Sequence, residues 1–311
     1  MAKYKVIPGG VCAAKGFSAS GVHAGFRANP NKLDLAIIKA DVRCAAAGVY
    51  TTNKVYGAPI KVDRAHLVDG HAQAVLVNSG NANTCAANGV DLANECCALV
   101  AQQLGIAAED VLPASTGVIG QKLPVEKGLD GVRQIIPAKL DKANGSDAAY
   151  AIMTTDTVRK ESAYELELSS GTIRIGAMAK GSGMIHPNMA TTLAYVTTDA
   201  KCDSADLQKM LHNAIDKSFN MCTVDGDTST NDTMILLANG ASGVEVKTEE
   251  DKAALAALIE HICMDMARRI ASDGEGATHL IVVESYGLPT EHDARLVAKA
   301  IAGSTLFKAP V

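Results

Sequence analysis

The sequence predicts a mixed α/β fold with α+β-like layers, and three observations support this prediction. Short apolar runs typical of strands alternate with amphipathic stretches typical of helices along the chain. Two of these runs form a hairpin pattern, which indicates antiparallel pairing. The order lacks the regular strand–helix repeat of a doubly wound fold. At 311 residues the chain is one large domain or two ordinary ones, with ample length for a buried core.

The first clear strand is Ala74–Val77, which runs into the turn residues 78–81. Asp91 then occupies an expected N-cap position ahead of a helical apolar stripe that extends to Leu104. Further along, Tyr164–Leu168 and Thr172–Met178 flank a Ser-Ser-Gly turn and predict a β-hairpin.

The second half of the chain supplies the remaining expected elements. The predicted strands are Leu193–Thr197, Met234–Ala238 and His279–Glu284, and the predicted helices run from Ser204 to about Phe219, from Thr248 to about Ser272 and from about Glu291 to Ala302. Acidic residues open the second of these helices, where a helix N-terminus favours negative charge. The best candidate boundary within the chain is the stretch 180–188, which contains Gly and Pro between two predicted strands. Such backbone freedom is costly in the middle of a sheet, so we expect it to serve a specific purpose.

Composition limits the classes of function. Lys and Arg number 29 against 34 Asp and Glu, a net charge of −5, so a strongly basic nucleic-acid surface is not expected. No apolar run approaches a membrane span, and the first ten residues do not read as a signal peptide, so we expect a cytoplasmic protein. Eight cysteines without a CxxC pair and eight histidines without HExxH argue against a disulfide framework or a zinc site.

Thr191 is the first candidate for chemistry. A threonine at a strand start is usually a simple β-former. Here a Gly-Ser-Gly turn precedes it, and such a turn could bring the hydroxyl to the preceding carbonyl for an N→O acyl shift. Cleavage would leave Thr191 as a new N-terminus, whose α-amine is suited to act as the base for its own hydroxyl.

Two other segments carry hydroxyl groups. Thr116-Gly117 can aim a hydroxyl and a backbone N–H at one point, as an oxyanion hole requires, although without a partner nucleophile an ordinary turn is the commoner explanation. The cluster 153–157 contains Thr154 and Thr155 and suits hydrogen bonding to a polar substrate, although such clusters are commonly turns.

The segment 225–232 is dense in oxygen ligands but fits known metal loops poorly. Its sixth position is Thr230 rather than Gly, and its twelfth is Leu236 rather than Glu, so it fails as an EF-hand. It nearly fits the aspartate-nucleophile phosphatase motif, except at Ser229. We therefore expect a structural turn with internal Asx hydrogen bonds. Glu275, between two glycines, is either a solvated loop residue or a ligand for a substrate amine.

Taken together, these segments resemble the ornithine acetyltransferase family, also called glutamate N-acetyltransferase, of arginine biosynthesis. The resemblance is collinear and covers essentially the whole chain. Its matching stretches are GGVCAAKGFSASGVHAGF at 9–26, NSGNANTCA at 78–86, PASTGVIG at 113–120, MTTDT at 153–157, KGSGMIHPNMAT at 180–191, TVDGDTSTNDT at 223–233 and SDGEGATHL at 272–280. The KGSGMIxPNMAT stretch is the most specific of them.

The resemblance implies a fold of the ornithine acetyltransferase type with an N-terminal threonine nucleophile. The chain is expected to cleave itself between Ala190 and Thr191, giving an alpha chain of residues 1–190 and a beta chain of residues 191–311. Thr191 would take the acetyl group of N2-acetylornithine and pass it to L-glutamate in a ping-pong scheme. Thr116 and Gly117 match the oxyanion-hole pair. Thr154 or Thr155, Lys180, Thr191 and Glu275 match substrate-binding positions.

The same resemblance implies no metal and no cofactor, with acetyl-coenzyme A as a candidate co-substrate. It implies no nucleic-acid or membrane partner, and a heterotetramer of two alpha and two beta chains. The family continues beyond the position of Val311 with a DPNWGR-like segment, and with an Asn and a Thr that help close the substrate site. We therefore expect self-cleavage to be retained more readily than turnover.

Three other interpretations are open at this point. An amidohydrolase or aminopeptidase with the same nucleophile would form ornithine without glutamate. An inactive truncated homologue would be indifferent to the Thr191→Ala substitution. A metal-dependent phosphatase would lose activity to chelators, and it is the weakest of the three.

Overall fold

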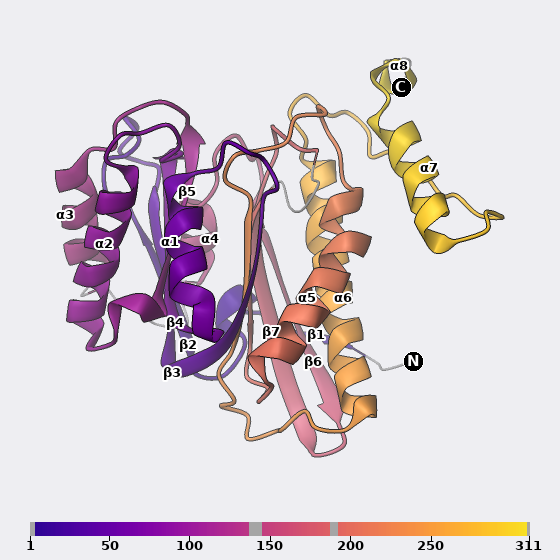
Figure 1. Ribbon diagram of the computed structural model, residues 1–311, viewed down its shortest axis with the longest axis horizontal. Helices are drawn as coiled ribbons and strands as arrows, with labels where there is room; N and C mark the ends of the chain where they lie inside the picture. The colour runs from indigo at the N-terminus through magenta and orange to yellow at the C-terminus, as the bar shows by residue number, and fades with distance from the viewer. Residues whose placement is uncertain (1–3, 137–144, 187–191, 310–311) are drawn as a thin grey trace.

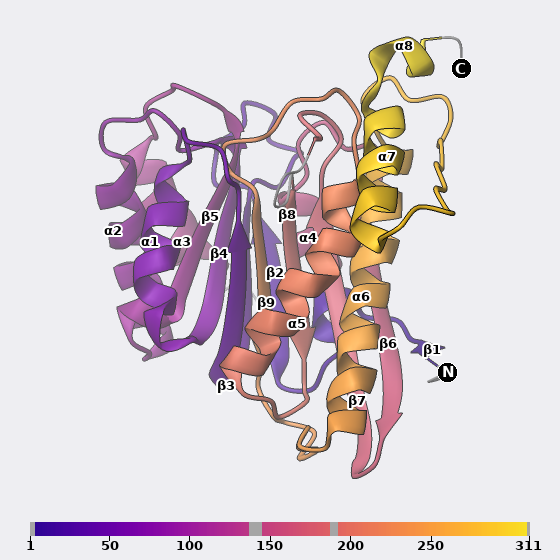
Figure 2. The same ribbon diagram turned by 45° about the vertical axis from the view of Figure 1, so that its right-hand side comes forward.

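The fold consists of two β layers enclosed by two helical layers (Figure 1). This arrangement is seen in a computed structural model that describes residues 4–136, 145–186 and 192–309. Helices α1, α2 and α3 cover one outer face, and α5 and α6 cover the other, as the turned view also shows (Figure 2). The expected mixed α/β class with layers is confirmed.

The strands form one hydrogen-bonded sheet of order β1-β6-β7-β8-β9-β3-β4-β5, with β2 paired to β3. Their bounds are β1 Lys5–Val6, β2 Phe17–Val22, β3 Leu35–Tyr50, β4 His71–Asn81, β5 Val111–Val118, β6 Lys160–Leu168, β7 Gly171–Lys180, β8 Leu193–Thr198 and β9 Thr233–Ala238. Strand β3 pairs with β4 through its first part and with β9 through its last part, and its register shifts between Lys39 and Cys44. This irregularity lets one strand belong to both β layers.

The α-helices are α1 Ala58–His66, α2 Gly89–Leu104, α3 Val125–Ile135, α4 Gly145–Ala151, α5 Ser204–Lys217, α6 Glu249–Ser272, α7 Glu291–Gly303 and α8 Thr305–Lys308. Helix α6 begins as its sequence predicts, because the side chain of Thr248 accepts a hydrogen bond from the Asp251 amide and three acidic residues occupy the first turn. In contrast to α6, which packs along the sheet, α7 and α8 extend from the layered body (Figure 1).

Alternation of side chains along the strands divides the apolar interior into three parts. Along β8, Leu193 and Tyr195 face the core between the β layers, while Ala194 and Val196 face the core beneath α5 and α6. Residues of β4 alternate in the same way between the central core and the core beneath α2 and α3. Strands β4 and β8 are therefore buried on both faces, which explains why their sequences are largely continuous apolar runs.

Most of the expected elements are confirmed, including the hairpin of β6 and β7, the strands β8 and β9, and the helices α5, α6 and α7. Two local expectations are wrong. Helix α2 begins at Gly89 after Asn88, so Asp91 lies inside the first turn, where its charge still complements the helix N-terminus. The segment 279–284 is not a strand, because no described strand pairs with it, and Leu280 and Val282 stay substantially exposed.

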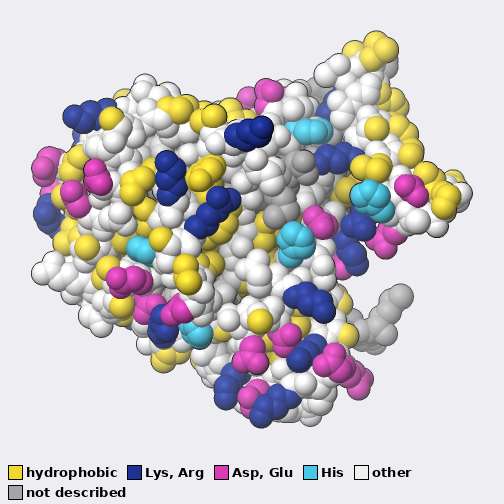
Figure 3. Space-filling model, in the orientation of Figure 1, with side chains coloured by type: hydrophobic (Ala, Val, Ile, Leu, Met, Phe, Trp, Pro, Cys, Tyr) yellow, Lys and Arg dark blue, Asp and Glu magenta, His cyan; other side chains and the backbone are white. Residues whose placement is uncertain are grey.

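The surface mixes both signs of charge. Lys and Arg side chains alternate with Asp and Glu side chains over the face seen in Figure 3. Apolar side chains gather on α7 and α8, where Leu296, Val297, Ile301, Leu306 and Phe307 are exposed. Among the described helices, none combines the length and apolar character needed to cross a bilayer.

Asp63 of α1 is fully buried, and neither of its carboxyl oxygens has a hydrogen-bond partner among the described residues. Burial raises the pKa of Asp63 well above its usual value. The folded chain therefore keeps a proton that the unfolded chain loses above about pH 4, so this group lowers the free energy of unfolding as pH rises.

We expect Asp63→Asn to raise the midpoint of thermal unfolding at pH 8 by about 2 °C or more. An amide does not ionise, so the variant avoids the free-energy cost of protonating a carboxylate on folding at this pH. The gain should shrink as pH falls towards 4. Circular dichroism melts across this range measure it, with Asp227→Asn at an exposed loop position as the control. A loss of stability at pH 8 would contradict the prediction.

Candidate functional site

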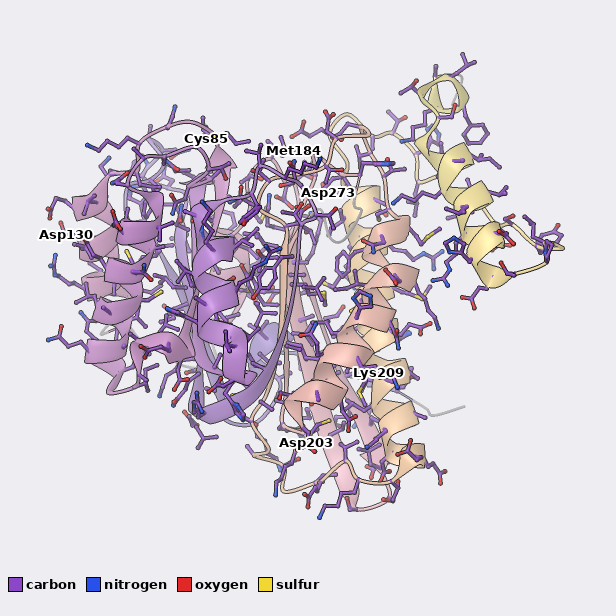
Figure 4. The ribbon with its side chains drawn as sticks, in the orientation of Figure 1. Cys85, Asp130, Met184, Asp203, Lys209 and Asp273 are labelled. Atoms are coloured by element: carbon purple, nitrogen blue, oxygen red, sulfur yellow. The ribbon has the colours of Figure 1, made fainter. Side chains whose placement is uncertain are left out.

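The expected site residues gather where several loops meet at one end of the sheet. The loop after β4 joins the start of β9 through a 2.6 Å hydrogen bond from the Thr84 hydroxyl to Asn231 Oδ1. The start of β9 joins the start of β8 through the Thr233 amide, which donates to the Thr192 carbonyl at 3.0 Å. Cys85, Met184 and Asp273, from three different loops, lie at this same end (Figure 4).

Thr116 and Gly117 lie near the end of β5, beside the end of β4. Thr116 is buried, and Gly117 has a φ of +133°, a conformation that favours glycine. A Cβ at Gly117 would also overlap the Gly80 carbonyl carbon. The Thr-Gly step is thus fixed by close backbone approach between two parallel strands.

Lys180 ends β7 as a buried cation. Its Nζ donates to the Thr154 hydroxyl at 3.2 Å, whereas Thr155 is exposed. Asp156 lies close by, since its Oδ1 accepts from the Gly181 amide at 2.7 Å. Of the two threonines in the cluster, the structure brings Thr154 to the lysine.

The charges around Lys180 oppose the effect of burial. Burial lowers the pKa of Lys180, while Asp156 and Asp232 act to raise it. Burial alone would raise the pKa of Asp156, but Lys180 and Lys160, together with hydrogen bonds from Lys160 and the Gly181 amide, bring it below its usual value. Asp156 therefore remains ionised between two cations.

Lys160, at the start of β6, connects two buried carboxylates. Its Nζ lies 2.6 Å from Asp156 Oδ1 and 2.6 Å from Asp273 Oδ2, and its side chain has no exposed area. Asp273 also accepts hydrogen bonds from the amide and hydroxyl of Thr157. This cluster ties the 153–157 loop to the C-terminal end of α6.

Glu275 is positioned by the loop that follows β7. Its amide donates to the Ser182 carbonyl at 3.0 Å, and the Ser182 hydroxyl donates to the Asp273 carbonyl at 2.6 Å. The Glu275 carboxylate lies directly against Gly183, where a Cβ would overlap it. A carboxylate and the Lys180 cation are thus held against the same short loop.

The segment 225–232 buttresses that loop. Asp225 accepts hydrogen bonds from the amides of Met184 at 2.6 Å and Ile185 at 2.9 Å. It also accepts from the Asp227 amide at 3.0 Å, which is the Asx bond expected from the sequence. Met184 has a φ of +59°, so this support holds a strained backbone. Within the described part of the chain, no group of three or more His, Cys, Asp or Glu could hold a metal ion.

The structure therefore brings Thr116, Gly117, Thr154, Lys180 and Glu275 to one end of the sheet. Ala190 and Thr191 lie outside the described residues, and the role of every predicted site residue stays a prediction. The β7 and β8 strands on either side of residues 181–192 pair with each other within the sheet.

Sequence reasoning missed four charged residues of this region: Arg27, Lys160, Asp232 and Asp273. Arg27 donates to the Met153 carbonyl and directly follows a segment that carries the resemblance. Asp232 and Asp273 lie within segments that carry the resemblance, and that location is the signal that could have identified them as site residues. Lys160 lies outside them, and its sequence context gave no sign of its burial.

The chain is similar in sequence to proteins of one known family. The sequence pattern of the ArgJ family matches residues 18–311. The chain belongs to the ArgJ family. The "Arginine biosynthesis bifunctional protein ArgJ" of Symbiobacterium thermophilum is 49% identical over 98% of this chain and 77% of its own length. The protein of the same name from Geobacillus kaustophilus is 46% identical over 98% of this chain and 75% of its own length.

Solved structures agree with this membership. The ArgJ crystal structure from Bacillus halodurans is 40% identical with a TM-score of 0.57, and covers 61% of this chain and 100% of its own. Ornithine acetyltransferase from Mycobacterium tuberculosis, solved in complex with ornithine, is 36% identical with a TM-score of 0.55, and covers 60% of this chain and 100% of its own. The PH0078 protein from Pyrococcus horikoshii, at 11% identity and a TM-score of 0.51, shares the fold alone.

Membership confirms the family and the fold type expected from the sequence motifs. The ArgJ chain described here is an enzyme of the acyltransferase class, with a place in amino-acid biosynthesis.

We expect Lys160→Met to lower the free energy of unfolding by about 3 kcal/mol or more, because it leaves Asp156 and Asp273 buried without their shared cation. Lys201→Met is the matched control, since Lys201 pairs with Glu245 at 3.5 Å on the exposed surface and should cost less than about 1 kcal/mol. Urea unfolding at pH 7 compares the two. Equal losses of unfolding free energy in the two variants would show that burying Lys160 between Asp156 and Asp273 adds no stability.

Proposed function

We propose that this ArgJ enzyme transfers the acetyl group of N2-acetylornithine to L-glutamate, giving ornithine and N-acetylglutamate. The observation that carries the proposal is the placement of Lys180 and Glu275 against one loop. A cation and a carboxylate at such a site match the carboxylate and amine of an amino acid. The ornithine bound in the Mycobacterium tuberculosis relative supports the substrate class.

Self-cleavage between Ala190 and Thr191 prepares the enzyme in this proposal, giving residues 1–190 and 191–311. The two solved ArgJ-type chains offer support by their size. Each solved chain matches over its full length, and the match takes up 60–61% of the present chain, which is about 190 of 311 residues. The matched length is therefore close to that of the proposed alpha chain, residues 1–190.

The reaction then proceeds by a ping-pong mechanism. The Thr191 hydroxyl attacks the acetyl carbonyl while its own α-amine takes the hydroxyl proton. Thr116 and Gly117 stabilise the negative charge that develops on the carbonyl oxygen. The C–N bond breaks, the departing amine takes up a proton, and ornithine leaves an acetyl ester on Thr191. The amine of glutamate attacks this ester and regenerates the hydroxyl.

Lys180 and Thr154 hold the carboxylate end of the substrate in this scheme, and Glu275 holds its amine. The name "bifunctional" in the relatives supports a second reaction. We assign to it the acetylation of glutamate by acetyl-coenzyme A, as a second acetyl donor. No metal or resident cofactor takes part in either reaction.

The intact mass of the purified protein under denaturing conditions tests this proposal. We expect two chains that meet between Ala190 and Thr191, and one uncut chain for Thr191→Ala. Incubation of the cut protein with acetyl-labelled N2-acetylornithine should label the 191–311 chain. Ornithine release beyond one equivalent per enzyme should then require glutamate, and continued release at the same rate without glutamate would favour an amidohydrolase instead.

The two neighbouring threonines make a matched pair of variants. Thr154→Val removes the hydroxyl that Lys180 contacts and should raise KM for N2-acetylornithine about tenfold with little change in kcat, since one hydrogen bond to a charged group is lost. Thr155→Val should leave KM within about twofold. Steady-state kinetics on both variants measure the difference, and a larger effect at Thr155 would reverse the assignment.

A further inference from the structure

Arg27 is a positively charged residue of the site to which the proposed reaction assigns no role. It lies in the loop between β2 and β3, beside the buried side chain of Asp34. Asp34 accepts hydrogen bonds from the Ala24 amide at 2.6 Å and from the Arg27 amide at 2.9 Å. These two bonds fix the backbone from which the Arg27 side chain extends, so its reach into the site is defined.

The Arg27 side chain connects two sides of the candidate site. Its stem lies against Gly80, where a Cβ would come within 2.9 Å of Arg27 Cγ. Gly80 in turn lies against Gly117 of the expected oxyanion pair. At the other end, the guanidinium Nη2 donates a hydrogen bond to the carbonyl of Met153, the residue before Thr154. The side chain therefore runs from the end of β4 to the loop that carries Thr154.

Most of the hydrogen-bonding capacity of this guanidinium is not used by the described residues. An arginine side chain has five N–H donors, and the described residues accept one bond, from Nη2 to Met153. Nε is buried without a partner among them. A buried polar group without a partner is uncommon in folded proteins, so this guanidinium is suited to bind a further acceptor.

Arg27 and Lys180 place two cations beside Thr154. Lys180 donates to the Thr154 hydroxyl at 3.2 Å, and Arg27 donates to the carbonyl of the preceding residue, Met153. Burial, and in smaller part the Arg27 charge, act to lower the pKa of Lys180, so the two cations are close enough to repel each other. The Asp156 carboxylate attracts both cations and offsets part of this repulsion. An anion bound between the two cations would relieve it further.

We propose that Arg27 and Lys180 together bind the α-carboxylate of the amino-acid substrate. This inference rests on the proposed function, which gives that carboxylate to Lys180 and Thr154. N2-acetylornithine, ornithine and glutamate all carry a carboxylate on the α-carbon, so one pair of cations serves both halves of the ping-pong reaction. The planar guanidinium of Arg27 fixes the direction of the carboxylate, whereas the Lys180 ammonium supplies a point charge. Arg27 thereby selects substrates that carry this group.

The direct test compares ornithine with putrescine, which is the same diamine without the carboxylate. Calorimetric titration of the purified full chain at pH 7 measures both dissociation constants, and ligand-observed NMR extends the range to weak binding. We expect Arg27→Met to weaken ornithine binding about thirtyfold, the scale of a lost hydrogen bond between charged groups. Putrescine should bind no more weakly than to the wild type, because it carries no carboxylate for Arg27 to hold.

Arg133→Met, at an exposed arginine of α3, is the matched control and should leave both dissociation constants unchanged. Circular dichroism confirms that each variant is folded. Equal weakening of ornithine and putrescine binding in Arg27→Met would assign Arg27 a purely structural role and overturn the inference. Ornithine binding within about threefold of the wild type would overturn it as well.

Arg27→Lys tests the same point if Arg27→Met fails to fold. It keeps the positive charge but loses the planar geometry, so we expect ornithine to bind about fivefold more weakly, with putrescine unaffected. Unchanged ornithine binding, or an equal loss for both diamines, would contradict the inference. A wild type that binds no ornithine would overturn the proposed function too, whereas ornithine binding that is insensitive to both Arg27 variants overturns this inference alone.

Discussion

The buried Lys160 ammonium is the contact on which the geometry of the site depends. It holds Asp156 of the 153–157 loop and Asp273 at the end of α6, and both carboxylates have lost most of their water. Either carboxylate alone would be costly to bury, and the shared cation offsets that cost only in this arrangement. The Asp156 carboxylate accepts a hydrogen bond from the Gly181 amide, and the Asp273 backbone carbonyl accepts one from the Ser182 hydroxyl. The same cluster therefore positions the loop after β7, against which Lys180 and Glu275 are held.

Close backbone approach supplies the second constraint, on the opposite side of the site. Gly117 and Gly80 face each other across two parallel strands at a distance that leaves no room for a side chain. The loop after β4 then reaches Asn231 through Thr84, so the position of the Thr-Gly step is transmitted to the start of β9. Rigid elements on both sides thus converge on one end of the sheet, which is the arrangement that preorganised catalysis requires.

Local signals in the sequence were enough for elements whose causes are local. The β6–β7 hairpin follows from its turn, and α6 from its cap and acidic first turn. The bend of β3 and the burial of Lys160 were not predictable, because both arise from partners far away in the chain. The segment 279–284 shows the converse, since its apolar pattern suits a strand but strand formation also needs a neighbouring backbone. The resemblance located Lys180 and Glu275, yet only the structure separates Thr154 from Thr155.

The buried charges of the site fall into two groups with different roles. Asp156 and Asp273 have pKa values below the usual range, so they stay ionised and fix the geometry. Lys180 and Asp232 are shifted the other way, each towards its neutral form by burial. A site built only of the first kind would be rigid but unable to exchange protons at neutral pH, and one built only of the second would lack fixed charges to hold it together. Acyl transfer needs both, since a zwitterionic substrate must be held while a proton follows its amine.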